Sequence, residues 1–231
     1  MSDTLASDYL SRDLFLSPQL GISGRKIASS INLFESLRPA VPIVVDLYAV
    51  LGGLPFTPAL SSYLNNLYFS IQAVLSDLDH YLVQPGNHAI ELLVLKWHTC
   101  AQPIAPSVLE AVSCTLQTLF TSPIDICPYR IQINDDGCIL FAFLDPSFGF
   151  RKLRQSILAA HPTLPSRQSS WVHIPLGRIL QAPTKSQFRR IQADFLTLPV
   201  YSLPETLTYF SVVHESRWYL EERSLISFVS I

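Results

Sequence analysis

The sequence predicts an α+β protein in which two similar blocks of strands and helices follow an N-terminal extension. Apolar residues make up 48% of the chain and charged residues 15%, against a usual charged share of roughly 25%, so much of the chain must be buried. Segments with the alternation of strands are interleaved with segments that have the 3–4 spacing of helices. No flexible linker interrupts the middle of the chain, which favours one domain over residues 41–231.

Residues 1–40 are polar and mixed, and they are expected to form a partly helical extension with a short helix over 29–37. The next segment is rich in β-branched residues, which favour strands. The first block is expected to contain, in order, a strand over 43–51, a helix from about residue 59, a strand over 88–97 and a helix over 107–120.

The clearest local signal is a hairpin that opens the second block. Two apolar runs, 124–133 and 138–144, are joined by a turn that ends in Asp136-Gly137. This pair favours a tight turn, because glycine accepts the positive φ that such turns require. The rest of the block is expected to contain, in order, a helix over 150–160, a strand over 171–180, a helix over 185–195 and a final strand pair over 208–218 and 225–231.

Several classes of protein are disfavoured. The mean hydropathy is +0.29, but no apolar run reaches the roughly 18 residues of a membrane helix. The first residues lack a basic region followed by an apolar one, so no secretory signal is expected. The four cysteines lack metal-ligand spacing, which indicates reduced thiols in the cytoplasm and neither a metal nor another cofactor.

The net charge of −2 provides no broad positive field for duplex DNA. A small phosphate-containing ligand or an RNA end remains a possible partner, because it needs only a few local donors. The oligomeric state is left open by the sequence.

His88 and His173 carry the strongest functional signal. Each stands near the start of a predicted strand that follows a polar loop, in equivalent places of the two blocks. If the blocks pack around one cleft, the two imidazoles could face each other across a phosphate. Such a pair can divide the labour of a general base and a general acid, because histidine titrates near neutrality.

Here the chain resembles the two-histidine phosphoesterase superfamily, which includes RNA 2′,3′-cyclic phosphodiesterases and 2′,5′-RNA-ligase-like proteins. The family signature is two copies of His-x-Thr/Ser followed by an apolar residue, each on a central strand of a duplicated β-α fold. The segments 84–90 (QPGNHAI) and 173–178 (HIPLGR) resemble the two copies, and 212–231 resembles the last hairpin of the family. The resemblance covers about residues 43–231.

The resemblance implies two β-α lobes with antiparallel sheets around a central cleft. It also implies a metal-independent cyclic phosphodiesterase that acts on RNA ends or small nucleotides, with His88 and His173 as catalytic residues. The family hydroxyls are replaced by Ile90 and Pro175, which offer no donor. Two lost hydrogen bonds to a charged group are worth about 1.5–3 kcal/mol each. The alternative is therefore a catalytically degenerate module that binds a phosphate, an RNA end or a protein.

Other residues have two interpretations each. His98 is an alternative first histidine, but its threonine follows by one position and so faces the opposite side of a strand, which favours His88. Arg178 could bind a phosphate or form a surface ion pair, and Ser216 and Tyr209 could supply substitute hydroxyls. Basic helix residues could rim the cleft or simply face solvent; they are Arg151, Lys152, Arg154, Arg189 and Arg190.

Pro175 carries a structural prediction of its own. Proline has no N–H to donate and is disfavoured inside a central strand. A bulge or an unpaired neighbour is therefore expected beside it.

Overall fold

The computed structural model describes residues 24–231, and the first part of the expected N-terminal extension, residues 1–23, lies outside this range. The predicted helix over 29–37 is wrong. Helix α2 (Gly24–Ile31) ends earlier, and β1 (Phe34–Leu37) pairs with β2 (Ala40–Pro42) as a small hairpin. The buried side chain of Phe34 packs against Tyr81 with ring centroids 5.4 Å apart, so this contact with a distant strand anchors β1.

Two larger antiparallel sheets form the two lobes. The first contains β3 (Val44–Gly52), β5 (Ile90–Lys96), β10 (Tyr209–Arg217) and β11 (Glu222–Ser230), in the order β11–β10–β3–β5. The second contains β4 (His80–Leu82), β6 (Ile124–Ile133), β7 (Cys138–Leu144), β8 (Val172–Ile179) and β9 (Glu205–Leu207), in the order β4–β8–β7–β6–β9. The predicted two-lobe α+β architecture is confirmed, with β4 and the pair β10–β11 each completing the sheet of the other block.

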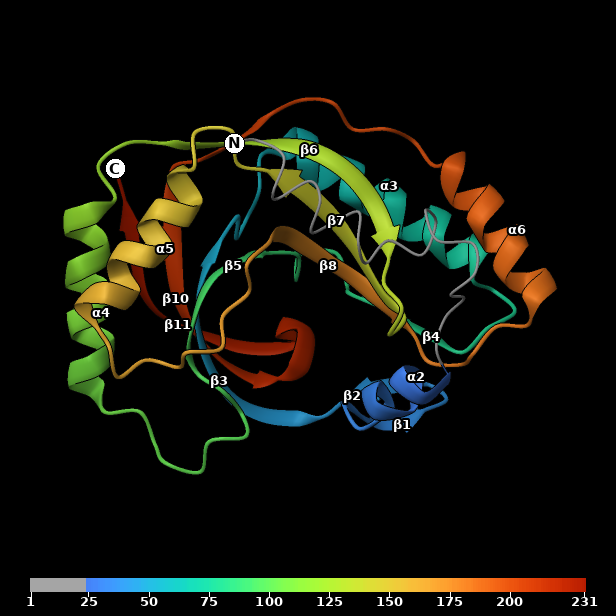
Figure 1. Cartoon of the computed structure of the whole chain (residues 1–231), viewed down its shortest axis with the longest axis horizontal. Coiled ribbons are helices and arrows are strands. Elements are labelled where there is room, and N and C mark those ends of the chain that lie inside the picture. Colours follow the sequence, from blue (N-terminus) through green and yellow to red (C-terminus); the bar gives the residue numbers. More distant parts are fainter. Residues whose placement is uncertain (1–23) are drawn as a thin grey trace.

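Helices cover the outer side of each sheet. Helices α4 (Pro106–Leu119) and α5 (Gly149–Ala160) lie on the four-stranded sheet, and α3 (Pro58–Val74) and α6 (Lys185–Leu196) lie on the five-stranded sheet (Figure 1). Their starts follow from local chemistry: the Thr57 hydroxyl caps α3, and Thr184 forms a capping box with Gln187 at α6. No described helix is both long and apolar enough to cross a membrane.

The predicted hairpin is confirmed with its expected bounds. Strands β6 and β7 pair antiparallel, and the Gly137 N–H donates to the Asn134 carbonyl at 2.9 Å. Gly137 has a φ of 85°, and an added Cβ would lie 2.6 Å from the Ile179 carbonyl oxygen. Glycine is therefore required here by both conformation and space.

The predicted irregularity at Pro175 is also confirmed. Along the β7–β8 ladder Leu140 pairs with Pro175 and Ile139 pairs with Gly177, so Leu176 is an extra residue in β8. The Leu176 carbonyl accepts a hydrogen bond from Val83 at 3.0 Å. The bulge thus redirects a carbonyl that the regular ladder would have paired.

The predicted central position of both histidine strands is half correct. Strand β8 lies inside its sheet, between β4 and β7, but β5 is an edge strand and begins after His88. At the free edge of β5 the side chains of Arg154 and Gln168 hydrogen-bond its backbone. Side chains, rather than another strand, complete this edge.

Candidate functional site

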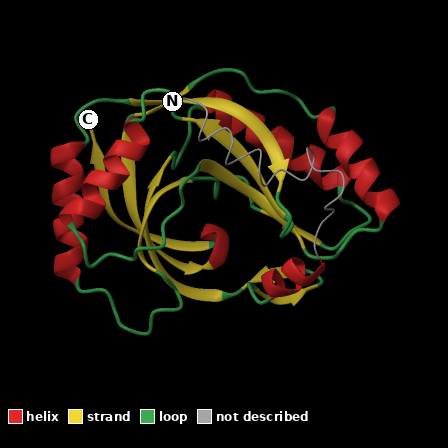
Figure 2. Cartoon of the chain, in the orientation of Figure 1, coloured by secondary structure: helices red, strands yellow, loops and turns green. Residues whose placement is uncertain are grey.

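A cavity of about 220 Å³ lies between the two lobes. Strands β3, β5 and β10 form one wall, β8 forms the opposite wall, and the 3₁₀ turn η1 (Trp218–Leu220) between β10 and β11 closes it. Figure 2 shows this turn as a short red coil between the two sets of strands. A second buried apolar cluster, separate from the main core, contributes Leu47, Ala49, Leu51 and Ala89 to the cavity wall.

The alternation of the chain before and into β5 decides which residues face the cavity. Asn87, Ala89 and Glu91 line it, whereas the intervening His88 is not among its lining residues and has an exposed fraction of 6%. Burial lowers the pKa of His88 to about 4. On β8 the same alternation places both His173 and Pro175 at the cavity. The cavity therefore contains one imidazole from the expected pair.

The family pattern fits the cavity face in a different register. In Ala89-Ile90-Glu91-Leu92, Ala89 and Glu91 both line the cavity and stand where the pattern has its histidine and its hydroxyl residue. Leu92 then stands at the apolar position that follows. The sequence analysis missed this register because it aligned the histidine of the pattern with His88. The signal that could have found it is the apolar Ile90 and Leu92, both fully buried on the other face.

His173 is half-buried on the β8 wall. Its Nδ1 atom is buried and has no hydrogen-bond partner within the described residues. Burial lowers the pKa of this imidazole to about 4, and the positive charge of Arg154 acts in the same direction. His173 is therefore neutral at pH 7 and presents one nitrogen that can accept a hydrogen bond and one that can donate.

Two carboxyl groups share the cavity, and neither was singled out from the sequence. Burial raises the pKa of Glu91 to about 6 and that of Glu215 to about 7. The Leu220 N–H donates to Oε1 of Glu215 at 2.8 Å, which partly offsets the effect of burial. The negative charge of Glu91 adds to the rise of the pKa of Glu215, whereas the positive charges of Arg154 and Arg167 oppose the rise of the pKa of Glu91.

Arg178 reaches the cavity, but its guanidinium is already engaged. Nη1 donates to Oδ2 of Asp136 at 3.0 Å and to Oγ of Ser30 at 2.6 Å, and Nε donates to the Tyr219 hydroxyl at 3.0 Å. The arginine is a largely buried connector between β8, the β6–β7 turn and η1, rather than a surface ion-pair partner.

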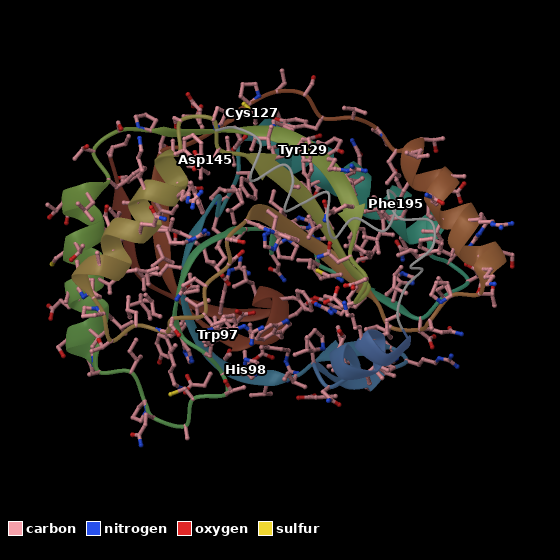
Figure 3. All side chains as sticks on the ribbon, in the orientation of Figure 1. Trp97, His98, Cys127, Tyr129, Asp145 and Phe195 are labelled. Carbon is pink, nitrogen blue, oxygen red and sulfur yellow. The ribbon has the colours of Figure 1, made fainter. Side chains whose placement is uncertain are left out.

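Ser216 and Tyr209 are not among the lining residues. The Ser216 hydroxyl donates to the Glu222 carbonyl at 3.2 Å, and the Tyr209 hydroxyl donates to the Pro55 carbonyl. His98 is outside the cavity too, with its ring edge-on to Trp218 at 4.9 Å. Figure 3 labels His98 beside Trp97, whose indole does line the cavity.

Arg154 contradicts the expectation of a solvated basic helix face. It is 6% exposed, and its guanidinium donates to the carbonyls of Leu92 at 2.5 Å, Glu91 at 3.0 Å and Trp171 at 3.3 Å. It therefore joins β5 to the chain entering β8. By contrast Arg151, Lys152, Arg189 and Arg190 are exposed, as a solvated face requires.

The turn η1 is held in an unusual conformation from both lobes. Tyr219 and Leu220 have φ values of 63° and 59°, in the left-handed region that side chains disfavour. The ring of Tyr219 packs on Tyr81 at 4.9 Å, while Arg223 Nη1 donates to Oδ1 of Asn87 at 2.6 Å and to the Leu220 carbonyl at 2.8 Å. These contacts keep the turn over the cavity.

Among the described residues, no group of three or more His, Cys, Asp or Glu side chains could hold a metal ion.

The chain was compared with known proteins. No protein-family model and no curated protein sequence matches it. Among solved structures, it is similar to TT0787 of Thermus thermophilus (TM-score 0.57, 13% identity, 80% of this chain and 97% of that one). It is also similar to E. coli LigT complexed with 3′-AMP (TM-score 0.59, 12% identity, 81% and 98%) and to a structure described as a phosphoesterase (0.54, 13%, 80% and 98%).

These identities are far below the level at which activity can be transferred, so the similarity concerns the fold. Its extent is nearly the full length of each solved chain. The cavity between the lobes, the histidine on β8 and the closing hairpin agree with the architecture that the sequence predicted. The chain therefore has the fold of LigT and TT0787.

Proposed function

We propose that this chain is a catalytically degenerate protein of the two-histidine fold whose interlobe cavity binds a small ligand without turning it over. The observation that carries the proposal is the identity of the residues on the cavity face. One wall presents His173 and Pro175, and the facing wall presents Ala89 and Glu91 where the family pattern has a histidine and a hydroxyl. Without the second imidazole and both hydroxyls, a phosphodiester lacks an acid–base partner and two donors.

Electrostatics supports the same proposal. A phosphate in this cavity would meet the carboxyl groups of Glu91 and Glu215, and Arg178, the guanidinium that lines it among residues 24–231, is paired with Asp136. Although LigT has been crystallised with phosphate and with ATP, these carboxyl groups make a phosphate or an RNA end a less favoured ligand for this chain.

The second candidate is a metal-independent cyclic phosphodiesterase acting on RNA ends or small nucleotides. The observation that favours it is that His173 and Glu91 line the same cavity. Glu91, with a pKa of about 6, could serve as the second acid–base group beside the imidazole. Any such turnover would then depend on His173 and Glu91 rather than on His88.

The experiment is hydrolysis of a panel of nucleoside 2′,3′-cyclic monophosphates in the presence of a chelator. Wild type is compared with His173→Ala and with a variant that restores the family pattern, Ala89→His/Glu91→Thr/Pro175→Thr. We expect no turnover by wild type above that of His173→Ala, and a gain in the restored variant. Wild-type hydrolysis that falls about 10²–10⁴-fold in His173→Ala would replace the binding proposal with the phosphodiesterase.

A cytoplasmic location is part of the same proposal. All four cysteines are free thiols, and Cys100 and Cys114 are exposed. Exposed thiols persist in a reducing compartment, which supports this location.

A further inference from the structure

The cavity combines acidic groups with aromatic walls, a combination that the fold alone does not explain. We infer that its ligand is a small organic cation, an ammonium or amidinium group carried on an apolar body. The inference rests on the proposal that the cavity binds a ligand, and it specifies the chemistry of that ligand.

The first step is the position of the two carboxyl groups. In the sheet Glu91 of β5 pairs with Leu51 of β3, and Glu215 of β10 pairs with Leu47 of the same strand. Both glutamates line the cavity, from the two strands that flank β3. Two like charges in one apolar cavity are costly unless a positive charge compensates them.

The second step is that no described side-chain cation pairs directly with either carboxylate, although the charges of Arg154 and Arg167 act on Glu91 and that of Arg223 acts on Glu215. Within residues 24–231 neither Glu91 nor Glu215 forms a salt bridge, and Glu215, which is 8% exposed, accepts hydrogen bonds from the backbone N–H groups of Leu220 and Tyr219. The neighbouring arginines are turned to other partners. Arg154 and Arg178 are engaged as described above, Arg167 lies 5.2 Å from the ring centroid of Trp97, and Arg223 binds Asn87 and Leu220.

The third step is the remaining wall. Trp97, Trp218 and Tyr219 line the cavity, and the faces of such rings attract cations. Leu47 and Leu51 offer an apolar surface to the body of the ligand. The volume of about 220 Å³ leaves room for a small organic molecule such as a single-ring amine.

His173 adds a polar group to the same cavity. Its imidazole is neutral because burial lowers its pKa to about 4, so it can accept a hydrogen bond without adding positive charge. An ammonium or amidinium ligand could donate to this ring and to a carboxylate together. A phosphate oxygen could bind an imidazole N–H, but it would be repelled by both carboxylates.

The test is isothermal titration calorimetry of the purified full chain at pH 8 with four matched probes. Benzylamine and benzamidine carry the proposed positive charge, benzyl alcohol is the neutral analogue of the amine, and benzoate carries a negative charge. We expect saturable binding of the two cations and at least about tenfold weaker binding of the alcohol and the acid.

Variants locate the binding. Glu91→Gln and Glu215→Gln keep the size of each side chain and remove its charge, so each should weaken benzylamine binding at least about tenfold. Glu110→Gln, on the exposed face of α4, should bind as wild type does. Circular dichroism and thermal unfolding confirm that each variant is folded, and Glu215→Asp, which retains the charge, should bind benzylamine more tightly than Glu215→Gln.

Three results would overturn the inference: no saturable binding of either cation, binding of benzyl alcohol or benzoate as tight as that of benzylamine, or unchanged affinity in both glutamine variants. Binding of benzoate or of a nucleotide alone would leave the proposed binding function in place and refute the cation. Hydrolysis of a cyclic phosphate would refute the proposed function itself, whichever probe binds.

Discussion

The side-chain amide of Gln168 pairs with the backbone of Val94 as a neighbouring strand would. The Val94 N–H donates to Oε1 at 2.8 Å, and Nε2 donates to the Val94 carbonyl at 2.9 Å. Val94 is fully buried on the edge strand β5, so its backbone groups need partners from the protein. Gln168 therefore completes part of a sheet edge next to the cavity.

Replacing Gln168 by Leu should destabilise the protein by about 2–4 kcal/mol, because it leaves a buried N–H and a buried carbonyl unpaired. Urea unfolding followed by fluorescence measures this loss. Gln168→Glu keeps the acceptor and removes the donor, so its loss should be smaller if its carboxyl is protonated at pH 5 and larger at pH 8. Equal stability of wild type and Gln168→Leu would show that water replaces the amide.

Arg154→Lys should cost about 2–4 kcal/mol although the charge is retained. A lysine ammonium cannot place its donors on the three carbonyls that the planar guanidinium reaches, and unpaired buried groups are expensive. The matched control is Arg189→Lys on the exposed face of α6, which should change stability by less than about 0.5 kcal/mol. A loss of the same size in both variants would contradict the bridging role of Arg154.

Alanine variants of His88 and His173 should have different effects on ligand affinity and on the free energy of unfolding. His173→Ala should weaken benzylamine binding roughly two- to tenfold, the value of one hydrogen bond, because this side chain lines the cavity. His88→Ala should leave that affinity unchanged and lower the free energy of unfolding, because its buried ring packs elsewhere. Calorimetry and urea unfolding measure the two effects, and equal loss of binding in both variants would return His88 to the site.

Ile90→Thr should destabilise the protein by about 1–3 kcal/mol and add no activity. Ile90 is fully buried on the face away from the cavity, so the new hydroxyl would lie in the core rather than near a ligand. Ile90→Val, which removes one methyl group without adding a polar atom, should cost about 0.5–1.5 kcal/mol. Turnover of a cyclic nucleotide by Ile90→Thr/Pro175→Thr would contradict this placement.

Glu215 should make the free energy of unfolding depend on pH. Burial raises its pKa from 4.5 to about 7, with Glu91 of β5 adding to the rise and Arg223 of β11 and the Leu220 N–H opposing it. The folded state thus holds the proton more tightly, and this stabilising contribution is lost as pH rises from about 4.5 through about 7. Glu215→Gln should therefore gain stability relative to wild type over this range, reaching on the order of 2–3 kcal/mol at pH 8.

The measurement is urea unfolding of both proteins between pH 4.5 and pH 8. The difference between variant and wild type is the informative quantity, since the lowered pKa values of His88 and His173 give wild type an opposing slope below pH 6.5. Glu110→Gln serves as the control and should show no such trend. A constant difference across the range would mean that Glu215 titrates normally.

Local signals in the sequence predicted the fold well. Asp136-Gly137 predicted the β6–β7 hairpin with its bounds, and Pro175 predicted the bulge in β8, because a turn and a missing N–H act through neighbouring residues. The short strands β1, β2, β4 and β9 were missed. Strands β4 and β9 pair with segments far away in the chain, and the β1–β2 hairpin is anchored by the contact of Phe34 with the distant Tyr81.

The candidate site was harder to predict for a similar reason. Strand β5 is buried along almost its whole length, so only the alternation at its start, with Ile90 and Leu92 in the core and Glu91 at the cavity, distinguishes its two faces. The histidine at position 88 then suggested a register in which the core residue Ile90 stands at the hydroxyl position. Arg154 looks like a solvated helix residue in sequence, and its burial depends on carbonyls more than sixty positions upstream.

Strand β3 pairs with β10, which lies more than 150 residues later in the chain, and this pairing decides when the cavity can form during synthesis. Strand β3 leaves the ribosome early, yet its neighbour β10 and the covering turn η1 are made only after most of the chain. Until then Leu47, Ala49 and Leu51 present an apolar, unpaired edge, the kind of surface that chaperones recognise and that aggregates. The cavity is thus completed only late in synthesis, and a nascent chain stalled before residue 209 lacks the wall formed by β10 and η1.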